Sequence, residues 1–348
     1  MPDNSTTYDA ILIVSFGGPE HPDHVLPFLE NVLRGRNVPR ERMLEVAEHY
    51  HHFGGVSPIN AQNRDLIDAL REDLPRLGVH LPIYWGNRNW HPLLPDTLAE
   101  MKAAGVRRAL AYFTSALSSY SGCRQYRENI TAAQTVVGDG APRVDKIRVF
   151  YNHPGFIEAM ADRVREALDR VPPERRAAAK LVFTAHSIPN SMAANCKYEE
   201  QLRESSRLVT EAVGRNEFIV AYQSRSGPPT QPWLEPDIGD VLKKCAADGV
   251  QDLVVVPIGF VSDHMEVIYD LDYEARHIAE HAGIHLVRAG TVGTHPRFVR
   301  MIGELIVERM NGVAERPALG VLGPCHDVCP VDCCLPPPRP PMPAGRPG

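Results

Sequence analysis

The strongest constraint on the fold is a regular alternation of short apolar runs with longer amphipathic segments. Eight runs rich in β-branched and aromatic residues predict strands at 9–16, 81–86, 107–113, 146–151, 180–186, 217–224, 251–259 and 284–289. Apolar residues at helical spacing lie between them, at 24–35, 60–74, 156–170 and 198–213. Strands that alternate with helices indicate parallel sheets joined by right-handed crossovers. The chain is therefore predicted to be an α/β protein.

Eight strands allow one large sheet, two sheets of four strands, or a closed barrel. The second half repeats the outline of the first, strand, helix, strand, helix, which favours two similar domains. We expect a break near 151–171, and hence domains at 1–150 and 151–318 followed by a tail at 319–348. The uneven loops, especially the helical insert at 25–74, argue against the barrel.

Composition limits the class of protein. The chain has 348 residues, of which 43% are hydrophobic and 23% charged, which is typical of a soluble globular protein. Its net charge of −6 argues against a nucleic-acid partner, because phosphate binding needs a positive field. The N-terminus has no basic region and only a short apolar run, so we expect no signal peptide, no membrane span and a cytoplasmic location. Seven cysteines, an odd number, argue against a fully paired disulfide framework.

One histidine lies where a parallel sheet binds its ligands. His186 ends the strand in LVFTAHSIP and precedes Pro189, so it projects from a carboxyl end into a turn. An imidazole there can act as a base near neutral pH or ligate a metal. A histidine that merely hydrogen-bonds a loop fits the pattern equally well.

A row of carboxylates follows the strand at 251–259. In DHMEVIYDLDYE, Glu266, Asp270 and Glu274 stand four residues apart, which places them on one face of a helix. Like charges at this spacing cost roughly 0.2–0.5 kcal/mol per pair, so folding alone does not favour them. The row suggests a path for a divalent cation, and a solvated helix face is the alternative. Carboxylates that lead to a histidine suit handing a metal on and do not resemble a closed structural zinc site.

Two further features suggest a binding cleft. Phe16-Gly17-Gly18-Pro19 ends the first strand, but neither GxxxxGK[ST] nor GxGxxG is present. The glycines are interpreted as letting a large flat ligand approach the backbone, with a tight turn as the alternative. Arg34 and Arg36 could bind carboxylates of an acidic ligand, although they could equally be ordinary surface arginines.

Together these segments resemble the ferrochelatase family, which inserts ferrous iron into porphyrins in haem synthesis. The motifs TAHSIP and GFVSDHMEVIYDLDYE carry the resemblance, FGGVSPIN and the QS…PWLEPD loop support it, and it extends from about Tyr8 to about Met310. It implies two similar Rossmann-like domains of the chelatase fold, each a four-stranded parallel sheet flanked by helices, with the porphyrin in the cleft between them.

The resemblance also assigns roles. It implies that His186 and Glu266 are the catalytic pair facing the porphyrin centre and that Asp270 and Glu274 continue a metal path for Fe²⁺, the substrate metal. The family's proximal position, often Tyr or Met, corresponds to Phe16. Since Phe cannot ligate iron, product haem should lack a protein ligand on that side.

The sequence is most similar to the actinobacterial type, which uses coproporphyrin III. Arg34, Ser57 and Tyr126 fall where that type contacts the propionates, and the polar stretch LRGRNVPRERMLE favours it over membrane-associated members. Protoporphyrin IX remains the alternative porphyrin. A cobalt or nickel tetrapyrrole chelatase and a non-catalytic haem chaperone remain alternative functions. Other enzymes of the haem pathway are expected partners.

The tail carries a cysteine cluster before a Pro-rich end that should be extended or disordered. Some ferrochelatases hold a [2Fe–2S] cluster with one internal and three C-terminal cysteines, and here Cys196 is the internal candidate. The three C-terminal ligands of this cluster would be Cys325, Cys329 and one of Cys333 or Cys334. A four-thiolate zinc site and free thiols are the alternatives. The cysteines interpreted as non-ligands are Cys123 and Cys245.

Overall fold

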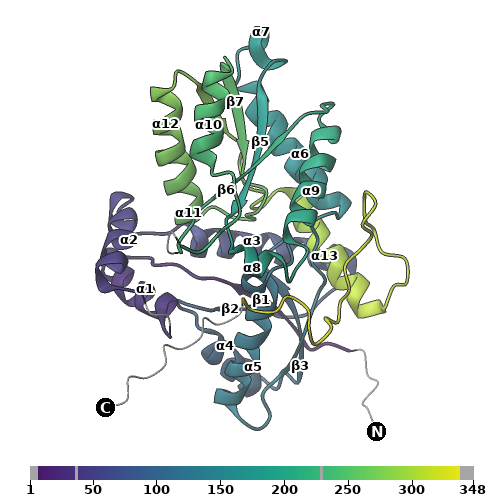
Figure 1. Cartoon of the computed structure of the whole chain (residues 1–348). Coiled ribbons are helices and arrows are strands. Elements are labelled where there is room, and N and C mark those ends of the chain that lie inside the picture. The colour runs from purple at the N-terminus through teal and green to yellow at the C-terminus, as the bar shows by residue number, and fades with distance from the viewer. Residues whose placement is uncertain (1–6, 36–37, 228–229, 338–348) are drawn as a thin grey trace.

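The computed structural model of the chain describes residues 7–35, 38–227 and 230–337. Its strands form two parallel four-stranded sheets, seen as the lower and upper parts of Figure 1. The first contains β1 (Ala10–Ser15), β2 (Ile83–Asn87), β3 (Arg108–Phe113) and β4 (Arg143–Lys146). The second contains β5 (Lys180–His186), β6 (Ile219–Gln223), β7 (Asp252–Val256) and β8 (His285–Arg288). The prediction of two such sheets is confirmed, and the barrel is excluded.

Both sheets have the same strand order, β2-β1-β3-β4 and β6-β5-β7-β8. In each, the chain moves from the first strand to one edge and then crosses back to the other side. The connections on either side of the β1–β3 pair therefore lead in opposite directions, and the same is true of the β5–β7 pair. Such a switch point is where ligands bind in open parallel sheets.

Helices cover both faces of each sheet. On the outer faces, α4 (Leu94–Ala103) and α5 (Gln125–Val137) pack on the first sheet, and α10 (Ile238–Ala247) and α12 (Arg276–His281) pack on the second. The inner faces share one core with α3 (Ile59–Asp73), α6 (Pro154–Asp169), α9 (Tyr198–Ala212) and α13 (Pro296–Asn311). Because α13 packs against α3 and α6, this core joins the two halves. The domain limits at 150 and 318 stay a prediction.

The remaining helical elements are short or lie near the junction of the halves. Two of them, α1 (Val25–Leu33) and α2 (Arg40–His52), form an arm beside the first sheet in Figure 1. The others are η1 (Pro22–His24), η2 (Leu74–Leu77), α7 (Pro173–Arg176), α8 (Asn190–Ala193), α11 (Met265–Val267) and the π-helices η3 (Tyr120–Arg124) and η4 (Ile268–Ala275).

The fourth strand differs from its prediction. The apolar run 146–151 was expected to be the strand, but the ladder with β3 pairs residues 143–146. The run instead carries the chain from one half to the other. There the guanidinium of Arg148 is fully buried and pairs with Glu308 of α13 through a 2.6 Å contact between Nε and Oε1. Burial in this crossing, rather than in a sheet, explains its apolar character.

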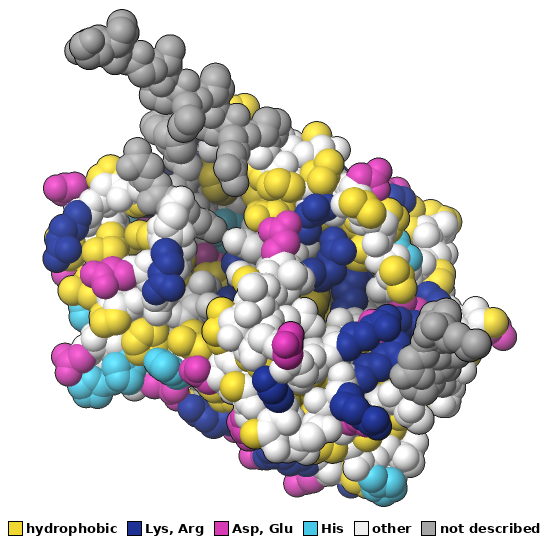
Figure 2. All heavy atoms as spheres, turned by 90° about the horizontal axis from the view of Figure 1, so that it is seen from below, with side chains coloured by type: hydrophobic (Ala, Val, Ile, Leu, Met, Phe, Trp, Pro, Cys, Tyr) yellow, Lys and Arg dark blue, Asp and Glu magenta, His cyan; other side chains and the backbone are white. Residues whose placement is uncertain are grey.

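The surface and the tail complete the description. Figure 2, which views the molecule from below, shows a group of Lys and Arg side chains on this face, with acidic residues around them. In the described part of the chain, no helix is long and apolar enough to cross a membrane. The cytoplasmic location therefore stays a prediction. The Pro-rich end at 338–348, like Arg36, lies outside the described residues.

Candidate active site

His186 is the last residue of β5, at the switch point of the second sheet. Its Nε2 lies 3.3 Å from Oε1 of Glu266, and its Nδ1 contacts the carbonyl oxygen of Ser187. Because a carbonyl oxygen can only accept, we assign a proton to Nδ1. The hydroxyl of Tyr198 donates to the His186 carbonyl oxygen at 3.0 Å and holds the end of the strand. The structure thus brings together the two residues predicted to be the catalytic pair.

The pair is ionised at neutral pH. Burial acts to lower the pKa of His186, but the charge and hydrogen bond of Glu266 outweigh it and raise the pKa to about 9. Burial acts to raise the pKa of Glu266, yet His186 holds it at about 2. The side chains of His186 and Glu266 keep 29% and 46% of their surfaces open to solvent, so a ligand can reach them. Their titration belongs to the pair rather than to either group.

The acidic row continues outward along an unusual helix. Glu266 lies in α11, whose start is capped by His264 Nδ1 accepting from the Glu266 N–H at 3.2 Å. Asp270 and Glu274 lie in η4, a π-helix, where a regular α-helix was expected. π-helical turns are rare and are frequent at functional sites. The row passes from Glu266 through half-buried Asp270 to exposed Glu274, as a path from the surface requires.

The surroundings of Asp270 bring the pKa of its carboxyl close to neutral pH. Burial is the main cause that raises its pKa to about 7, and the neighbouring charge of Glu266 adds to it, while a hydrogen bond from Ser224 opposes it. Burial also raises the pKa of Glu274, followed by the charge of Asp237. Sequence reasoning missed Ser224, although it directly follows β6. Its φ of 62° marks a strained turn that holds the hydroxyl against Asp270.

The arm of the first half closes on this segment. His49 of α2 stacks on Tyr269 of η4 with ring centroids 3.8 Å apart, and His52 contacts Tyr273 at 4.4 Å. Tyr50, between them, lies close enough to the row for Glu266 and Asp270 to add to the effect of burial, which raises its pKa. No sequence pattern identified Tyr50, because its place depends on contact between separate halves.

The residues expected to contact the porphyrin lie in different surroundings. Tyr126 is buried and stacks on Phe113 at 5.2 Å. The guanidinium of Arg88 lies 4.8 Å from the ring of Tyr126 and 5.5 Å from that of Phe16, so it joins two predicted contacts. Arg88 was missed, yet it follows β2 at the carboxyl edge of the first sheet, where the strand-end rule would have found it.

Ser57 and Arg34 differ in exposure. Ser57 is buried, and its N–H donates to the Pro19 carbonyl oxygen at 2.8 Å. Arg34 is exposed at the end of α1 and donates to the Asn31 side chain. In the described chain, no contact joins Arg34 to Ser57 or to Tyr126, so its propionate contact stays a prediction.

The structure supports the alternative interpretation of the glycines, a tight turn, and the approach of a ligand to them stays a prediction. A Cβ on Gly18 would lie 2.7 Å from Cβ of Ser57 and 2.8 Å from Cγ2 of Ile59. Gly17 has a φ of +80°, and a Cβ there would lie 2.9 Å from Cβ of Asn87. The protein's own side chains fill the space beside both residues. The glycines are needed for the turn and its packing.

The tail folds back onto both halves. Arg124 of η3 donates to the carbonyl oxygens of Val331 and Cys333 at 2.7 and 3.2 Å. On the other side, Gln201 of α9 donates to Sγ of Cys325 at 3.4 Å. The tail therefore connects the first half of the chain to the second.

Several thiols converge in this tail. The ligand atoms of His326, Cys329 and Cys333 lie within 4.8 Å of one another, and Sγ of Cys334 lies 3.6 Å from that of Cys333. Cys123, interpreted from sequence as a non-ligand, is hydrogen-bonded to Cys329. Donation from Cys123 is the main cause that lowers the pKa of Cys329 below its usual value.

The other predicted thiols are less central. Cys196 donates to the carbonyl oxygens of Met192 and Ala193 at 3.4 and 3.5 Å, although Cys333 is near enough to influence it. Among the described residues, no interaction joins Cys325 to another thiol. Cys245 lies in the core of the second half, as expected.

Comparison with known proteins agrees with this geometry. The family profile described as Ferrochelatase matches residues 8–310. A ferrochelatase of Rhodopirellula baltica is 61% identical over 98% of this chain and 97% of its own length. Coproporphyrin III ferrochelatases of Frankia alni and Streptomyces coelicolor are 53% and 50% identical, over 97% and 99% of this chain and 89% and 98% of their own lengths.

Among solved structures, SirB from Bacillus subtilis with Fe³⁺ matches with a TM-score of 0.54 over 87% of this chain and 96% of that one. Its sequence identity is 14%, so the likeness shows the fold alone. That fold is the chelatase arrangement predicted from sequence.

Proposed function

The chain belongs to the ferrochelatase family, whose members insert ferrous iron into a porphyrin in haem synthesis, and we propose that its porphyrin is coproporphyrin III. Relatives at 50–53% identity are described as coproporphyrin III ferrochelatases. Buried Ser57 and the Arg88–Tyr126 contact supply polar groups suited to propionates. Coproporphyrin carries four propionates where protoporphyrin IX carries two, so polar contacts distinguish them.

The observation that carries the proposed mechanism is the 3.3 Å contact between His186 and Glu266 with Asp270 behind it. Fe²⁺ would pass from Glu274 through Asp270 to Glu266. Its arrival would neutralise Glu266 and so remove the charge that keeps His186 protonated, because metal binding displaces protons. His186 would then release its proton to water and accept one pyrrole proton as the metal enters, and the second pyrrole proton would pass to water. The two pyrrole protons leave and the Fe²⁺ charge replaces theirs, so the exchange balances.

We expect Phe16 to lie on the other side of the porphyrin from His186. Its ring packs edge-on against Phe28 at 6.2 Å and offers no ligand atom. The product would therefore leave without a bond from this side chain to iron. Weak retention of product suits an enzyme that must release iron coproporphyrin III to a later step.

The test is anaerobic Fe²⁺ insertion with coproporphyrin III and protoporphyrin IX side by side. We expect kcat/KM for coproporphyrin III to be at least about ten-fold higher, since an unpaired buried polar group costs about 1–3 kcal/mol. His186→Ala should abolish insertion while porphyrin still binds. Equal kcat/KM values would contradict the porphyrin assignment. A single stoichiometric round would favour a chaperone, and greater turnover with Co²⁺ or Ni²⁺ on another tetrapyrrole would favour a different chelatase.

The tail supports a second proposal, a [2Fe–2S] cluster. Such a cluster needs four thiolates, and Cys123, Cys329, Cys333 and Cys334 form a continuous group of contacts. Lys146 lies near enough to lower the pKa of Cys329, so a positive charge faces these thiols. The donor set fits the cluster, which would supply one-electron redox chemistry when bound. Cys196 and Cys325, the ligands first expected, are less well placed.

Purified protein should be brown, with visible absorbance that dithionite bleaches. Cys123→Ser should lose this absorbance, and Cys325→Ser, the matched control, should keep it. Colourless protein with one equivalent of zinc would indicate a site made by His326, Cys329 and Cys333 instead. Loss of colour in Cys325→Ser but not in Cys123→Ser would restore the original ligand set.

A further inference from the structure

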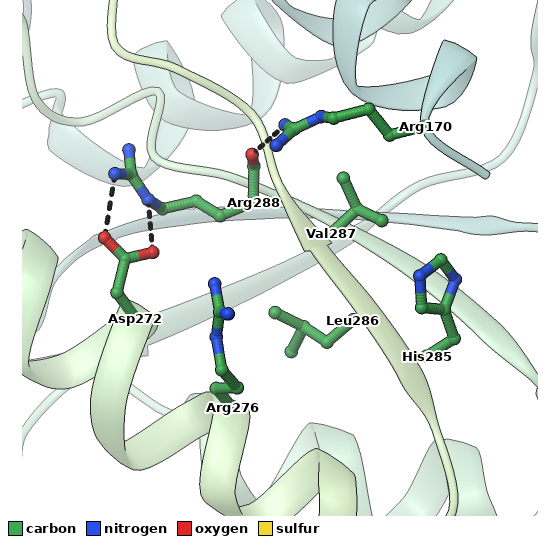
Figure 3. Close-up of a pocket in the computed structure, with 7 residues that line it drawn as sticks. All are labelled: Arg170, Asp272, Arg276, His285, Leu286, Val287 and Arg288. Atoms are coloured by element: carbon green, nitrogen blue, oxygen red, sulfur yellow. Dashed lines mark hydrogen bonds and ion pairs between the residues drawn. The ribbon is translucent and has the colours of Figure 1, made fainter.

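Arg288, at the end of β8, holds two carboxylates at once. Its Nε and Nη2 lie 2.7 and 2.8 Å from the two oxygens of Asp272, which is the bidentate geometry that only arginine provides (Figure 3). Its Nη1 also donates to Oδ1 of Asp263 at 3.1 Å. The Arg288 side chain is 15% exposed, so these contacts are largely shielded from water.

The two partners bracket the residues that carry the chemistry. Asp263 precedes Glu266 on the approach to α11, and Asp272 follows Asp270 within η4. All four carboxylates belong to one short segment, 263–275. Glu266 and Asp270 engage His186 and Ser224, whereas Asp263 and Asp272 engage Arg288. One guanidinium thus pins the segment by carboxylates that the metal path does not use.

Asp263 is fixed from two further directions. Its N–H donates to Oε1 of Gln62 in α3 at 2.8 Å, and the hydroxyl of Thr291 donates to its carboxylate at 3.3 Å. Because α3 belongs to the first half, the start of the segment is tied to both halves. Arg288 connects this anchored point to the middle of the π-helix.

The segment needs such an anchor. Repulsion among carboxylates four residues apart and the rarity of π-helical hydrogen bonding both oppose its conformation. Catalytic groups must nevertheless be held to about 0.5 Å, and a shift of about 1 Å can cost about 100-fold in rate. The support has to come from outside the segment.

We propose that Arg288 is a positioning residue for metal insertion, which clamps Asp263 and Asp272 so that Glu266 faces His186 and Asp270 stays behind it. The inference rests on the proposed role of these residues in iron insertion. In this role Arg288 would act through Asp263 and Asp272 rather than by binding metal or porphyrin. Removing the clamp should therefore impair the metal step and leave porphyrin binding intact.

The hollow in Figure 3 offers a matched control. It measures about 580 Å³ and is lined by Arg170 and Arg276 as well as by Arg288 and Asp272. Arg276 points into the same hollow, but within the described residues it makes no ion pair with Asp263 or Asp272. Arg276→Met therefore removes a neighbouring positive charge without touching the clamp.

The experiment compares Arg288→Met, Arg288→Lys and Arg276→Met in the full chain. Arg288→Met should lower kcat for Fe²⁺ insertion about 100-fold, with the porphyrin Kd within about two-fold of wild type. Arg288→Lys keeps the charge but not the bidentate contact, so it should recover part of kcat. Arg276→Met should stay within about two-fold of wild type. An unchanged kcat in folded Arg288→Met, or a parallel loss in Arg276→Met, overturns the proposal.

Two additional variants separate positioning from a general loss of structure. In the Glu266→Gln background, Arg288→Met should add little further loss, because the residue that it positions is already disabled. Fully multiplicative losses would overturn the proposal. If Arg288→Met does not fold, Asp272→Asn, which leaves the Asp263 contact in place, should still lower kcat by about ten-fold, and no loss there overturns it. Wild-type protein that turns over no Fe²⁺ would overturn the proposed function itself, whereas active wild type with unaffected variants overturns only the clamp.

Discussion

The switch points of the two sheets have the same backbone arrangement and opposite chemistry. In the first, Ser15 ends β1 and its hydroxyl accepts from two neutral groups, Asn63 at 3.0 Å and Thr114 at 3.2 Å. In the second, His186 ends β5 and faces the carboxylate of Glu266. Strand order thus fixes where a ligand binds, and the side chains at the strand ends decide which half handles charge.

This division suits a reaction with two unlike substrates. The first half presents Phe16, Tyr126 and buried Ser57, which are suited to a large ring with polar edges. The second half presents the row that we propose carries Fe²⁺. With the proposed metal path on one side, the other side is free to hold the porphyrin.

The largest expected effect is a loss of turnover, and it tests whether the two halves have different roles. Glu266→Gln removes the carboxylate that is proposed to receive Fe²⁺ beside His186, so turnover should fall by about 10²–10⁴-fold. The control is Glu20→Gln, because Glu20 follows β1 and pairs with Arg64 in the first half at 2.7 Å. Its effect should stay within about two-fold. Steady-state rates at saturating porphyrin measure both, and equal losses would refute the division of labour.

A smaller effect, on the free energy of unfolding, should appear in both halves. Each half has a tightly packed glycine just after one of its strands. A Cβ on Gly18 would meet side chains, whereas one on Gly259 would lie 2.7 Å from the backbone Cα of Ala185. We expect Gly18→Ala to lower the free energy of unfolding by about 1–3 kcal/mol and Gly259→Ala to lower it more. Gly290→Ala, whose nearest neighbour would lie 3.4 Å away, should change it by less than about 0.5 kcal/mol. Denaturant unfolding that ranks all three equally would contradict the packing argument.

The smallest effect is a pH dependence of KM for Fe²⁺, which we expect to arise in the second half. Burial raises the pKa of Asp270 to about 7, so its carboxylate is mostly protonated below pH 7 and ionised above it. Since a metal binds the ionised form, KM for Fe²⁺ should fall about five-fold as pH rises from about 6 to 7. The pKa values of His186 and Glu266, about 9 and about 2, lie outside this window. Asp270→Asn should flatten the dependence, and an equally steep profile in that variant would assign it elsewhere.

Local sequence predicted the elements better than their contacts. The strand ending at His186 and the spacing of Glu266 and Asp270 could be predicted because periodicity and strand ends are local properties. The π-helix could not be predicted, because its surroundings include residues from other elements, such as Arg288 of β8, which pairs with Asp272. The fourth strand was misplaced because burial in a crossing between halves gives the same apolar run as burial in a sheet.

The cysteines also show that contacts between distant parts of the chain could not be predicted from sequence. Their clustering in the tail was visible in the sequence, but the approach of Cys123 to Cys329 was not, since it depends on how the tail folds across both halves. The position of Cys196 after TAHSIP predicts it as the internal ligand. Cys196 lies near enough to Cys333 and Cys334 to interact with them, and its role as a ligand stays a prediction.

By itself, the sequence determined two parallel sheets, the histidine at a strand end and the carboxylates at helical spacing, because each depends on residues a few positions apart. Only the tertiary structure decided that Arg288 binds Asp263 and Asp272 in the segment that carries those carboxylates, that Arg88 joins Phe16 to Tyr126, and that the glycines pack against the protein's own side chains. These contacts join elements distant in the chain, and their energies arise only when each half folds and brings those elements together.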